Sequence, residues 1–475
     1  MFKKLSQMST GKRIIKNFFS LTISNLAGQF FAVISTVYLA KVLGAGGFGR
    51  IIFAQSIIVY FALITDFGLR TVGVREVAKN RDEIKKYISN LLALKFILAV
   101  TSFILLLIFI FFINKPIDYK ILIALFGLTL FPQIILLDWA FEGTEQMEFV
   151  GIARIVRPIL YLLFVLLFVK KPHDLVDVPL INLGSFLAVA ILLGYIFYRN
   201  YGGFKLSFNL KFWKKLVIMA LPLGLSAFLL QINSNIDIVM LGFMKSDIEV
   251  GWYGAAYKII YFLIGFGGCF GIAIFPIISR YYQESKEKLK KLIYYVCKVS
   301  IFLGLPISVG GVILAPKIIR LIYGIGYQEC ILTFQILLGY LFLSYIMAPF
   351  FYLLQASSKM KYFLNVAIIA AITNISLNII LIPRYSLMGA AVATVISYLV
   401  VFIMLYTYSS QKIIYISINQ PLLIAAVASL AMGVLVYLVD LNLFADCLIG
   451  FILYIIFIFI LKGITIKELK YLFAR

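Results

Sequence analysis

The chain has 475 residues, of which 63% are hydrophobic and 13% are charged, and its mean hydropathy is +1.04. Soluble domains are about half apolar and about one quarter charged, so this composition excludes a soluble globular fold and predicts a protein embedded in a lipid bilayer. A net charge of +23 by itself would fit a nucleic-acid partner, but the distribution of that charge along the chain argues against one.

The apolar segments predict an all-α polytopic membrane protein. A helix needs about 20 apolar residues to cross the bilayer, and the sequence contains about fourteen such segments. No connection between them is long enough to fold as a soluble domain. The predicted spans are residues 19–43, 51–70, 88–113, 119–139, 149–169, 178–198, 217–243, 251–279, 292–315, 331–355, 362–383, 388–408, 420–439 and 443–461.

The connections alternate in charge. Most Lys and Arg residues fall in the N-terminal tail, the even-numbered loops and the C-terminal tail. Cytoplasmic loops carry an excess of basic residues, so we expect both termini in the cytoplasm, an even number of spans and a place in the cytoplasmic (inner) membrane. The first apolar segment is too long for a signal peptide and is expected to be a retained helix. The basic loops then contact anionic membrane lipids, and no nucleic acid is expected as a partner.

Cysteine and histidine are sparse. Four cysteines, Cys269, Cys297, Cys330 and Cys447, have no CxxC spacing, and His173 is the single histidine. We therefore predict cysteines packed in or near helices. We expect no metal site, no cofactor and no His-based catalysis.

The sequence contains an internal repeat. The first span ends in VLGAGGFGRIIFAQSI and the seventh in MLGFMKSDIEVGWYGAAYKI. Both have Leu-Gly, then a glycine (Gly49 and Gly251), then an alanine five residues later (Ala54 and Ala256). AFEGTEQM and LLQASSKM, at the ends of the fourth and tenth spans, align at a similar separation. These matches predict two six-helix lobes of the same orientation, related by a pseudo-two-fold axis along the membrane normal.

The repeat sets the expected domain boundaries. Residues 1–205 form an N-terminal lobe, residues 206–410 a C-terminal lobe, and residues 411–475 an additional transmembrane hairpin. The segment between the lobes, RNYGGFKLSFNLKFWKKL at residues 199–216, combines large apolar side chains with lysines. It is expected to lie at the cytoplasmic membrane interface.

Motifs in most spans carry a family resemblance through their order and spacing. They are Asn25 with YLAKVLGAGGFG, DFGLRTVGVRE (66–76), DWAFEGTEQM (138–147), LPLGLS followed by Asp237 and MLG, GWYGAAYKI, FPIISR (275–280), LIYGIGY (321–327) and TNISLNIILIPRYSLMGAAVAT (373–394). Together they resemble the oligosaccharide flippase branch (Wzx-type polysaccharide and O-antigen transporters) of the multidrug/oligosaccharidyl-lipid/polysaccharide exporter superfamily.

The resemblance implies a V-shaped fold of fourteen helices with a central cavity between two lobes. It implies alternating access for an undecaprenyl-pyrophosphate-linked oligosaccharide in cell-surface polysaccharide biosynthesis. The chain would then be a transporter and not an enzyme. Its partners would be the lipid-linked oligosaccharide and membrane lipids, with polymerase and export components as further candidates.

Other functions stay open at this stage. A wall-precursor (lipid II-type) flippase and a drug/cation antiporter belong to the same superfamily, so fold cannot separate them. The antiporter would be expected to have a more clearly acidic cavity. An integral-membrane polymerase or glycosyltransferase is disfavoured, because the external loops are short and hold few catalytic candidates.

Cations inside the spans are the first candidate site residues, since charges at membrane depth are usually functional or paired. Arg154 and Arg157 are three residues apart and share a helix face, and Lys258 lies in the eighth span. In a cavity they could bind the cargo pyrophosphate, which arginine contacts with paired donors. The alternative is an ordinary position at a helix end, with Lys258 snorkelling to the outer interface. Lys95 and Lys298 are expected to snorkel.

Acids and amides in the spans complete the candidate set. Asp237, near Asn233, could line the cavity, serve as the coupling group or pair with Lys258. Asp66, Arg70 and Asp138 are candidates for coupling or gating. Asp66 and Arg70 are expected to form a local i,i+4 pair. Asp138, Glu142 and Glu145 are expected to pair with Arg154 or Arg157 across the loop that follows the fourth span.

Overall fold

A computed structural model describes residues 10–203, 205–357 and 359–463 of the chain. In these ranges the regular structure is entirely helical, and no strand is found. The predicted all-α fold class is therefore confirmed. The predicted cytoplasmic termini and the side chain of Cys269 lie outside the described residues. Cys297 and Cys330 are buried, as predicted, and Cys447 is an exposed residue of a helix.

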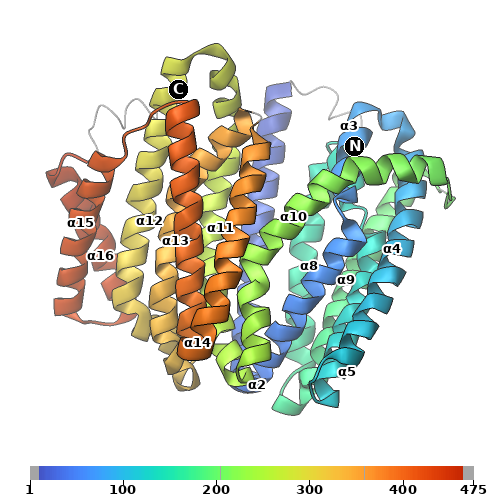
Figure 1. The fold of residues 1–475 in the computed structure, drawn as a ribbon, viewed down its shortest axis with the longest axis horizontal. Helices are drawn as coiled ribbons and strands as arrows, with labels where there is room; N and C mark the ends of the chain where they lie inside the picture. Colours follow the sequence, from blue (N-terminus) through green and yellow to red (C-terminus); the bar gives the residue numbers. More distant parts are fainter. Residues whose placement is uncertain (1–9, 204, 358, 464–475) are drawn as a thin grey trace. The chain divides into compact units, whose positions relative to one another are not determined.

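The backbone packs into two units, Met1–Gly251 and Trp252–Arg475. The elements of the first unit are α2 (Thr10–Asp66), α3 (Leu69–Lys79), η1 (Arg81–Glu83), α4 (Ile84–Phe112), α5 (Ile117–Gly127), η2 (Leu128–Leu130), α6 (Pro132–Ile135), α7 (Asp138–Gly143), α8 (Met147–Phe168), η3 (Pro172–Val176), α9 (Asp177–Tyr201) and α10 (Leu210–Met244). Figure 1 shows that α10, which contains Pro222, bends along its length.

Helix α11 (Asp247–Glu284) begins in the first unit and continues into the second. The other elements of the second unit are α12 (Lys286–Ile322), η4 (Ile325–Cys330), α13 (Ile331–Ala356), α14 (Met360–Lys412), α15 (Asn419–Val439) and α16 (Leu443–Ile460). The lobe boundary predicted at residue 205, and the placement of the lobes about an axis, stay predictions.

Eleven helices in the described residues are long and apolar enough to cross a membrane. The two longest, α2 and α14, are interrupted by residues with positive φ, Gly44 at 67° and Ser386 at 49°. A chain reversal at each point would turn one long helix into two antiparallel spans. Glycine has no Cβ and adopts this conformation without strain, which explains the position of the kink in α2. The predicted number of about fourteen spans stays a prediction.

The core of the first unit positions the polar residues described below. Trp139 of α7 is 1% exposed and packs with buried residues of α3, α4, α9 and α10. Gly73 of α3 makes room for it, since a Cβ there would lie 2.6 Å from Cε3 of the indole ring. Helices α3 and α7 are thereby held against each other, with the charged residues of both at their shared edge.

The additional hairpin, α15 and α16, packs on α12 in the second unit (Figure 1). Lys317 of α12 forms ion pairs with this hairpin. Its Nζ lies 2.6 Å from Oδ2 of Asp446 and 2.5 Å from Oδ1 of Asp440. The Lys317 amine also donates to the carbonyl oxygen of Leu441 at 2.7 Å. Asp446 is 1% exposed, so its carboxylate depends on this partner.

Replacement of Lys317 by Met is expected to loosen this hairpin, because it leaves the buried Asp446 carboxylate without a counter-charge. Hydrogen exchange of α15 and α16 in the purified protein should become faster, while α13 stays protected. The double variant K317M/D446L should recover part of the protection, since no charge is then stranded. Equal exchange in the wild type and K317M would show that the hairpin is held by apolar packing alone.

Candidate functional site

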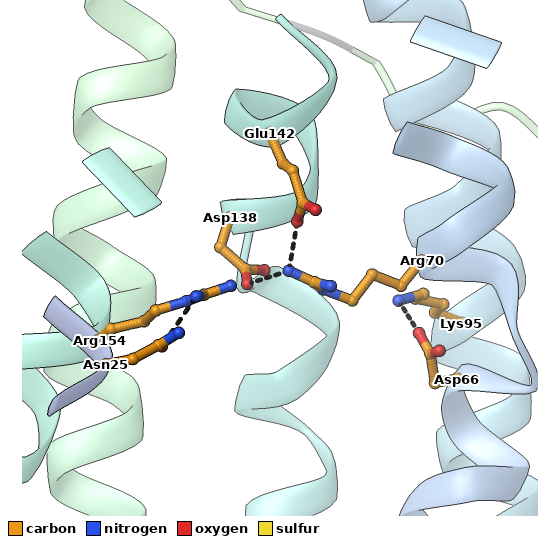
Figure 2. A network of polar contacts seen from close by, with 7 residues as sticks. All are labelled: Asn25, Asp66, Arg70, Lys95, Asp138, Glu142 and Arg154. Atoms are coloured by element: carbon orange, nitrogen blue, oxygen red, sulfur yellow. Dashed lines mark hydrogen bonds and ion pairs between the residues drawn. The ribbon is translucent and has the colours of Figure 1, made fainter. Parts of the chain in front are cut away.

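A network of charged and polar side chains lies inside the first unit (Figure 2). It brings together residues that are far apart in the sequence. Its members come from α2, α3, α4, α7 and α8, and they are Asn25, Asp66, Arg70, Lys95, Asp138, Glu142 and Arg154.

Arg70 is the centre of the acidic part of the network. Its Nη2 lies 2.9 Å from Oδ2 of Asp138 and 2.7 Å from Oε2 of Glu142. The two acids are four residues apart on α7 and therefore face the same side of that helix. One guanidinium is thus shared by two carboxylates, and the charge of Arg70 is fully compensated.

Lys95 and Asp66 form a second ion pair. Nζ of Lys95 lies 2.5 Å from Oδ1 of Asp66, and the lysine side chain is only 6% exposed. Lys95 therefore does not snorkel, and that prediction is wrong. The predicted pair between Asp66 and Arg70 is also wrong. Helix α2 ends at Asp66 because Phe67 and Gly68 have φ values of 41° and 80°, so no helical i,i+4 relation exists across them.

Arg154 is held differently from Arg70. Its Nη1 donates a hydrogen bond to Oδ1 of Asn25 at 2.8 Å, and it has no ion pair with an acid among the described residues. Figure 2 shows its guanidinium pointing toward Asp138 from the side opposite Arg70. The expected pairing of Asp138 and Glu142 with Arg154 is wrong, because Arg70 occupies both carboxylates.

Asn25 was not singled out as a partner of Arg154 by the sequence. The contact depends on a close approach of α2 to α8 at Gly28, one turn after Asn25. A Cβ on Gly28 would lie 2.4 Å from the carbonyl oxygen of Arg154. A glycine within an apolar span is the signal that could have indicated this helix contact.

Arg157 has a neutral neighbour as well. Its guanidinium carbon lies 3.3 Å from the ring centre of Phe186 in α9, a cation–π contact. The two arginines thus meet different helices, although three residues separate them. Lys258 of α11, in the second unit, is half-buried and has no ion pair among the described residues.

The predicted residues Asp237 and Asn233 are buried in α10, at 1% and 7% exposure. Neither side chain reaches open solvent in this conformation. A pairing of Asp237 with Lys258, and a direct role in binding cargo, stay predictions. Where the structure describes the chain, it contains no group of three His, Cys, Asp or Glu residues suited to a metal ion.

Replacement of Arg70 by Gln is expected to destabilise the protein by about 2 kcal/mol, because two partly buried carboxylates lose their counter-charge. The loss is below the 3–5 kcal/mol of a fully buried pair, since the Arg70 side chain is 36% exposed. Thermal unfolding in detergent measures it. R70Q/D138N/E142Q, which removes all three charges, should unfold closer to the wild type. An R70Q protein as stable as the wild type would contradict a structural role for the pair.

The family model described as "Polysaccharide biosynthesis protein" matches residues 14–282. The chain belongs to this family. A second model, MatE, matches residues 222–380. The resemblance to flippases of the multidrug/oligosaccharidyl-lipid/polysaccharide exporter superfamily is thereby confirmed, and the chain is a multi-pass membrane protein.

Curated relatives of this family member come from bacteria and from archaea. A "Putative O-antigen transporter" of Shigella dysenteriae is 26% identical over 66% of this chain and 78% of its own length. The "Capsular polysaccharide biosynthesis protein CapF" of Staphylococcus aureus is 23% identical over 83% of this chain and 99% of its own length. The "Probable low-salt glycan biosynthesis flippase Agl15" of Haloferax volcanii is 22% identical over 80% of both chains.

Solved structures share the fold. The "Lipid II flippase MurJ, inward closed conformation" matches 93% of this chain and 98% of its own, with a TM-score of 0.77 and 18% identity. An inward-facing multidrug resistance MATE transporter matches 81% of this chain and 94% of its own, with a TM-score of 0.67 and 16% identity. Both likenesses support the transporter fold class that the sequence predicted.

Proposed function

We propose that this member of the polysaccharide biosynthesis family flips a polyprenyl-pyrophosphate-linked oligosaccharide across the cytoplasmic membrane by alternating access. Its relatives named as O-antigen transporters, a capsular polysaccharide protein and a glycan flippase support this assignment. The chain would supply cell-surface polysaccharide biosynthesis and act without catalysis. Both termini would lie in the cytoplasm, as the distribution of basic residues indicates.

The observation that best supports the candidate site is that some cations inside the helices form ion pairs with acids and others do not. Arg70 and Lys95 are neutralised by acids within ion-pair distance. Arg154 instead forms its hydrogen bond with an amide and interacts only at longer range with Asp138 and Glu142, which Arg70 binds directly, and Arg157 contacts an aromatic ring. A cation at membrane depth that has no ion pair of its own is costly unless an anion or water compensates it.

The proposed cargo provides such an anion. A pyrophosphate must shed water to cross about 30 Å of hydrocarbon, and charge-assisted hydrogen bonds from arginine replace that water well. We assign Arg154 and Arg157, with Lys258 of the second unit, to pyrophosphate binding. Asn25 orients the guanidinium of Arg154.

The paired residues have a different proposed role. Asp66, Arg70 and Asp138 are assigned to gating, because their ion pairs join α2, α3, α4 and α7, and a change of pairing would couple motions of those helices. Asp138 is the point of exchange, since Arg70 binds it and Arg154 points toward it (Figure 2). Asp237 and Asn233 remain candidates for cargo contact or for a coupling step.

A wall-precursor flippase is the alternative, because lipid II also carries a polyprenyl pyrophosphate and the same cations would serve it. The first experiment is therefore a deletion strain whose lipids are analysed by mass spectrometry, with wild-type complementation as the control. Accumulation of a complete oligosaccharide repeat on polyprenyl pyrophosphate, with loss of surface polymer, is expected. Accumulated lipid II would select the wall-precursor function. Normal lipid intermediates and polymer would favour drug or small-molecule antiport.

A further inference from the structure

A pocket of about 330 Å³ lies in the second unit, apart from the network described above. Four of its residues share one face of the first turns of α12, and two come from the connection between α14 and α15. The lining residues are Glu287, Lys290, Lys291, Tyr294, Ile416 and Ser417. Its volume is at the lower end of the range for small-ligand sites, about 300–1,000 Å³.

The pocket has a basic rim and an apolar floor. Lys290 and Lys291 are exposed, while Ile416 is 1% exposed and Tyr294 is half-buried. The hydroxyl-bearing Ser417 is exposed beside them. Glu287 reduces the local charge, but the two lysines leave the lining positive by one. A ligand that fits this lining has an anionic end toward the lysines and an apolar part toward Tyr294 and Ile416.

The position of the pocket selects among such ligands. Lys286, Lys288, Lys290 and Lys291 fall within the first six residues of α12, where the distribution of basic residues predicts the cytoplasmic membrane surface. That surface is rich in anionic phospholipids, which bind basic pockets between membrane helices. A soluble phosphate would satisfy the lysines but would leave the apolar floor unused.

We propose that this pocket binds the headgroup region of an anionic glycerophospholipid, with its phosphodiester at Lys290 and Lys291 and the first part of its acyl chains against Tyr294 and Ile416. The site is separate from the cargo cations Arg154 and Arg157. It would tie the start of α12 to the connection before α15, because the lipid contacts both. The proposal does not depend on which cargo the protein carries.

Native mass spectrometry of the purified full-length protein tests the site with phosphatidylglycerol and with neutral phosphatidylcholine. K290Q/K291Q is expected to retain phosphatidylglycerol about tenfold less well than the wild type. The matched control K286Q/K288Q removes the same charge from the same helix start but from residues outside the pocket lining. It should stay within about twofold. E287Q should bind phosphatidylglycerol more tightly than the wild type, because it removes the one negative charge of the lining.

Three outcomes would overturn the proposal. An equal loss in both double variants would mean diffuse attraction of lipid to the basic helix start. Equal retention of phosphatidylglycerol and phosphatidylcholine would mean that the site does not select for charge. Displacement of the lipid by millimolar inorganic phosphate, with equal binding of phosphate to the lipid-free protein, would identify a soluble anion as the ligand. Unchanged melting temperatures establish that the variants are folded.

Discussion

Replacement of Arg154 by Gln is expected to lower the rate of oligosaccharide-lipid flipping at least about tenfold. A hydrogen bond to a charged group contributes about 1.5–3 kcal/mol, and each 1.4 kcal/mol is about tenfold. The triple variant R154Q/R157Q/K258Q is expected to abolish flipping, since it removes each cation that we assign to the pyrophosphate. The measurement is flipping of a fluorescent polyprenyl-pyrophosphate oligosaccharide in proteoliposomes.

Two further variants separate cargo binding from structure. R199Q removes an exposed arginine of α9 in the same unit and should leave flipping unchanged. N25A should reduce flipping less than R154Q, because it leaves the charge in place and removes only the group that orients it at 2.8 Å. Cargo affinity should fall with flipping rate in R154Q. Wild-type transport and affinity in the triple variant would refute the assignment of these cations.

The helical architecture was predictable because it depends on local composition. Long apolar segments fix the positions of the helices, and the kink in α2 falls at Gly44, within a run of glycines. The kink in α14 falls at Ser386, three residues after Pro383. No glycine marks that position, so a residue with positive φ could not be predicted there from the sequence.

Pairing of the charges was less predictable. The sequence offered Arg70 a local partner four residues away, but its partners in the structure, Asp138 and Glu142, are 68 and 72 residues away. The break at Phe67 and Gly68 turns Arg70 away from Asp66. Long-range pairing depends on which helices pack together, and one sequence without tertiary information does not determine this. Residue type was therefore enough to choose the candidate residues, whose roles stay predictions, but the ion pairs predicted for Asp66 and Asp138 were wrong.

The glycines of the repeat show the opposite case. Gly49 and Gly251 were aligned from sequence as equivalent positions, and in the structure they contact each other. A Cβ on Gly49 would lie 2.8 Å from the backbone nitrogen of Gly251 and 1.8 Å from the carbonyl oxygen of Asp247. A Cβ on Gly251 would lie 2.0 Å from the carbonyl oxygen of Ala45. The repeat thus marked a place where α2 and the start of α11 approach at backbone distance.

Replacement of Gly49 by Ala is expected to destabilise this close packing of α2 and α11 by about 3 kcal/mol, the upper end for overpacking. Backbone atoms of Asp247 and Gly251 cannot yield as a flexible side chain would, so α2 and α11 must separate. The adjacent ion pair resists separation, since Nε of Arg50 lies 3.0 Å from Oδ2 of Asp247. Thermal unfolding measures the loss, and disulfide cross-linking of cysteines placed at Ala45 and Ile248 reports the separation.

Gly46 supplies the matched control on the same helix. A Cβ there would lie 3.6 Å from the Ile248 side chain, an ordinary contact, so G46A should change stability by less than about 0.5 kcal/mol. G251A should resemble G49A, and the double variant should cost less than the sum, because both side chains force apart the same two helices. If G49A and G46A unfolded at the same temperature and cross-linked equally, α2 and α11 could accommodate a side chain at Gly49 without a loss of stability. Glycine at these two aligned positions would then not be required by the close approach of α2 to α11.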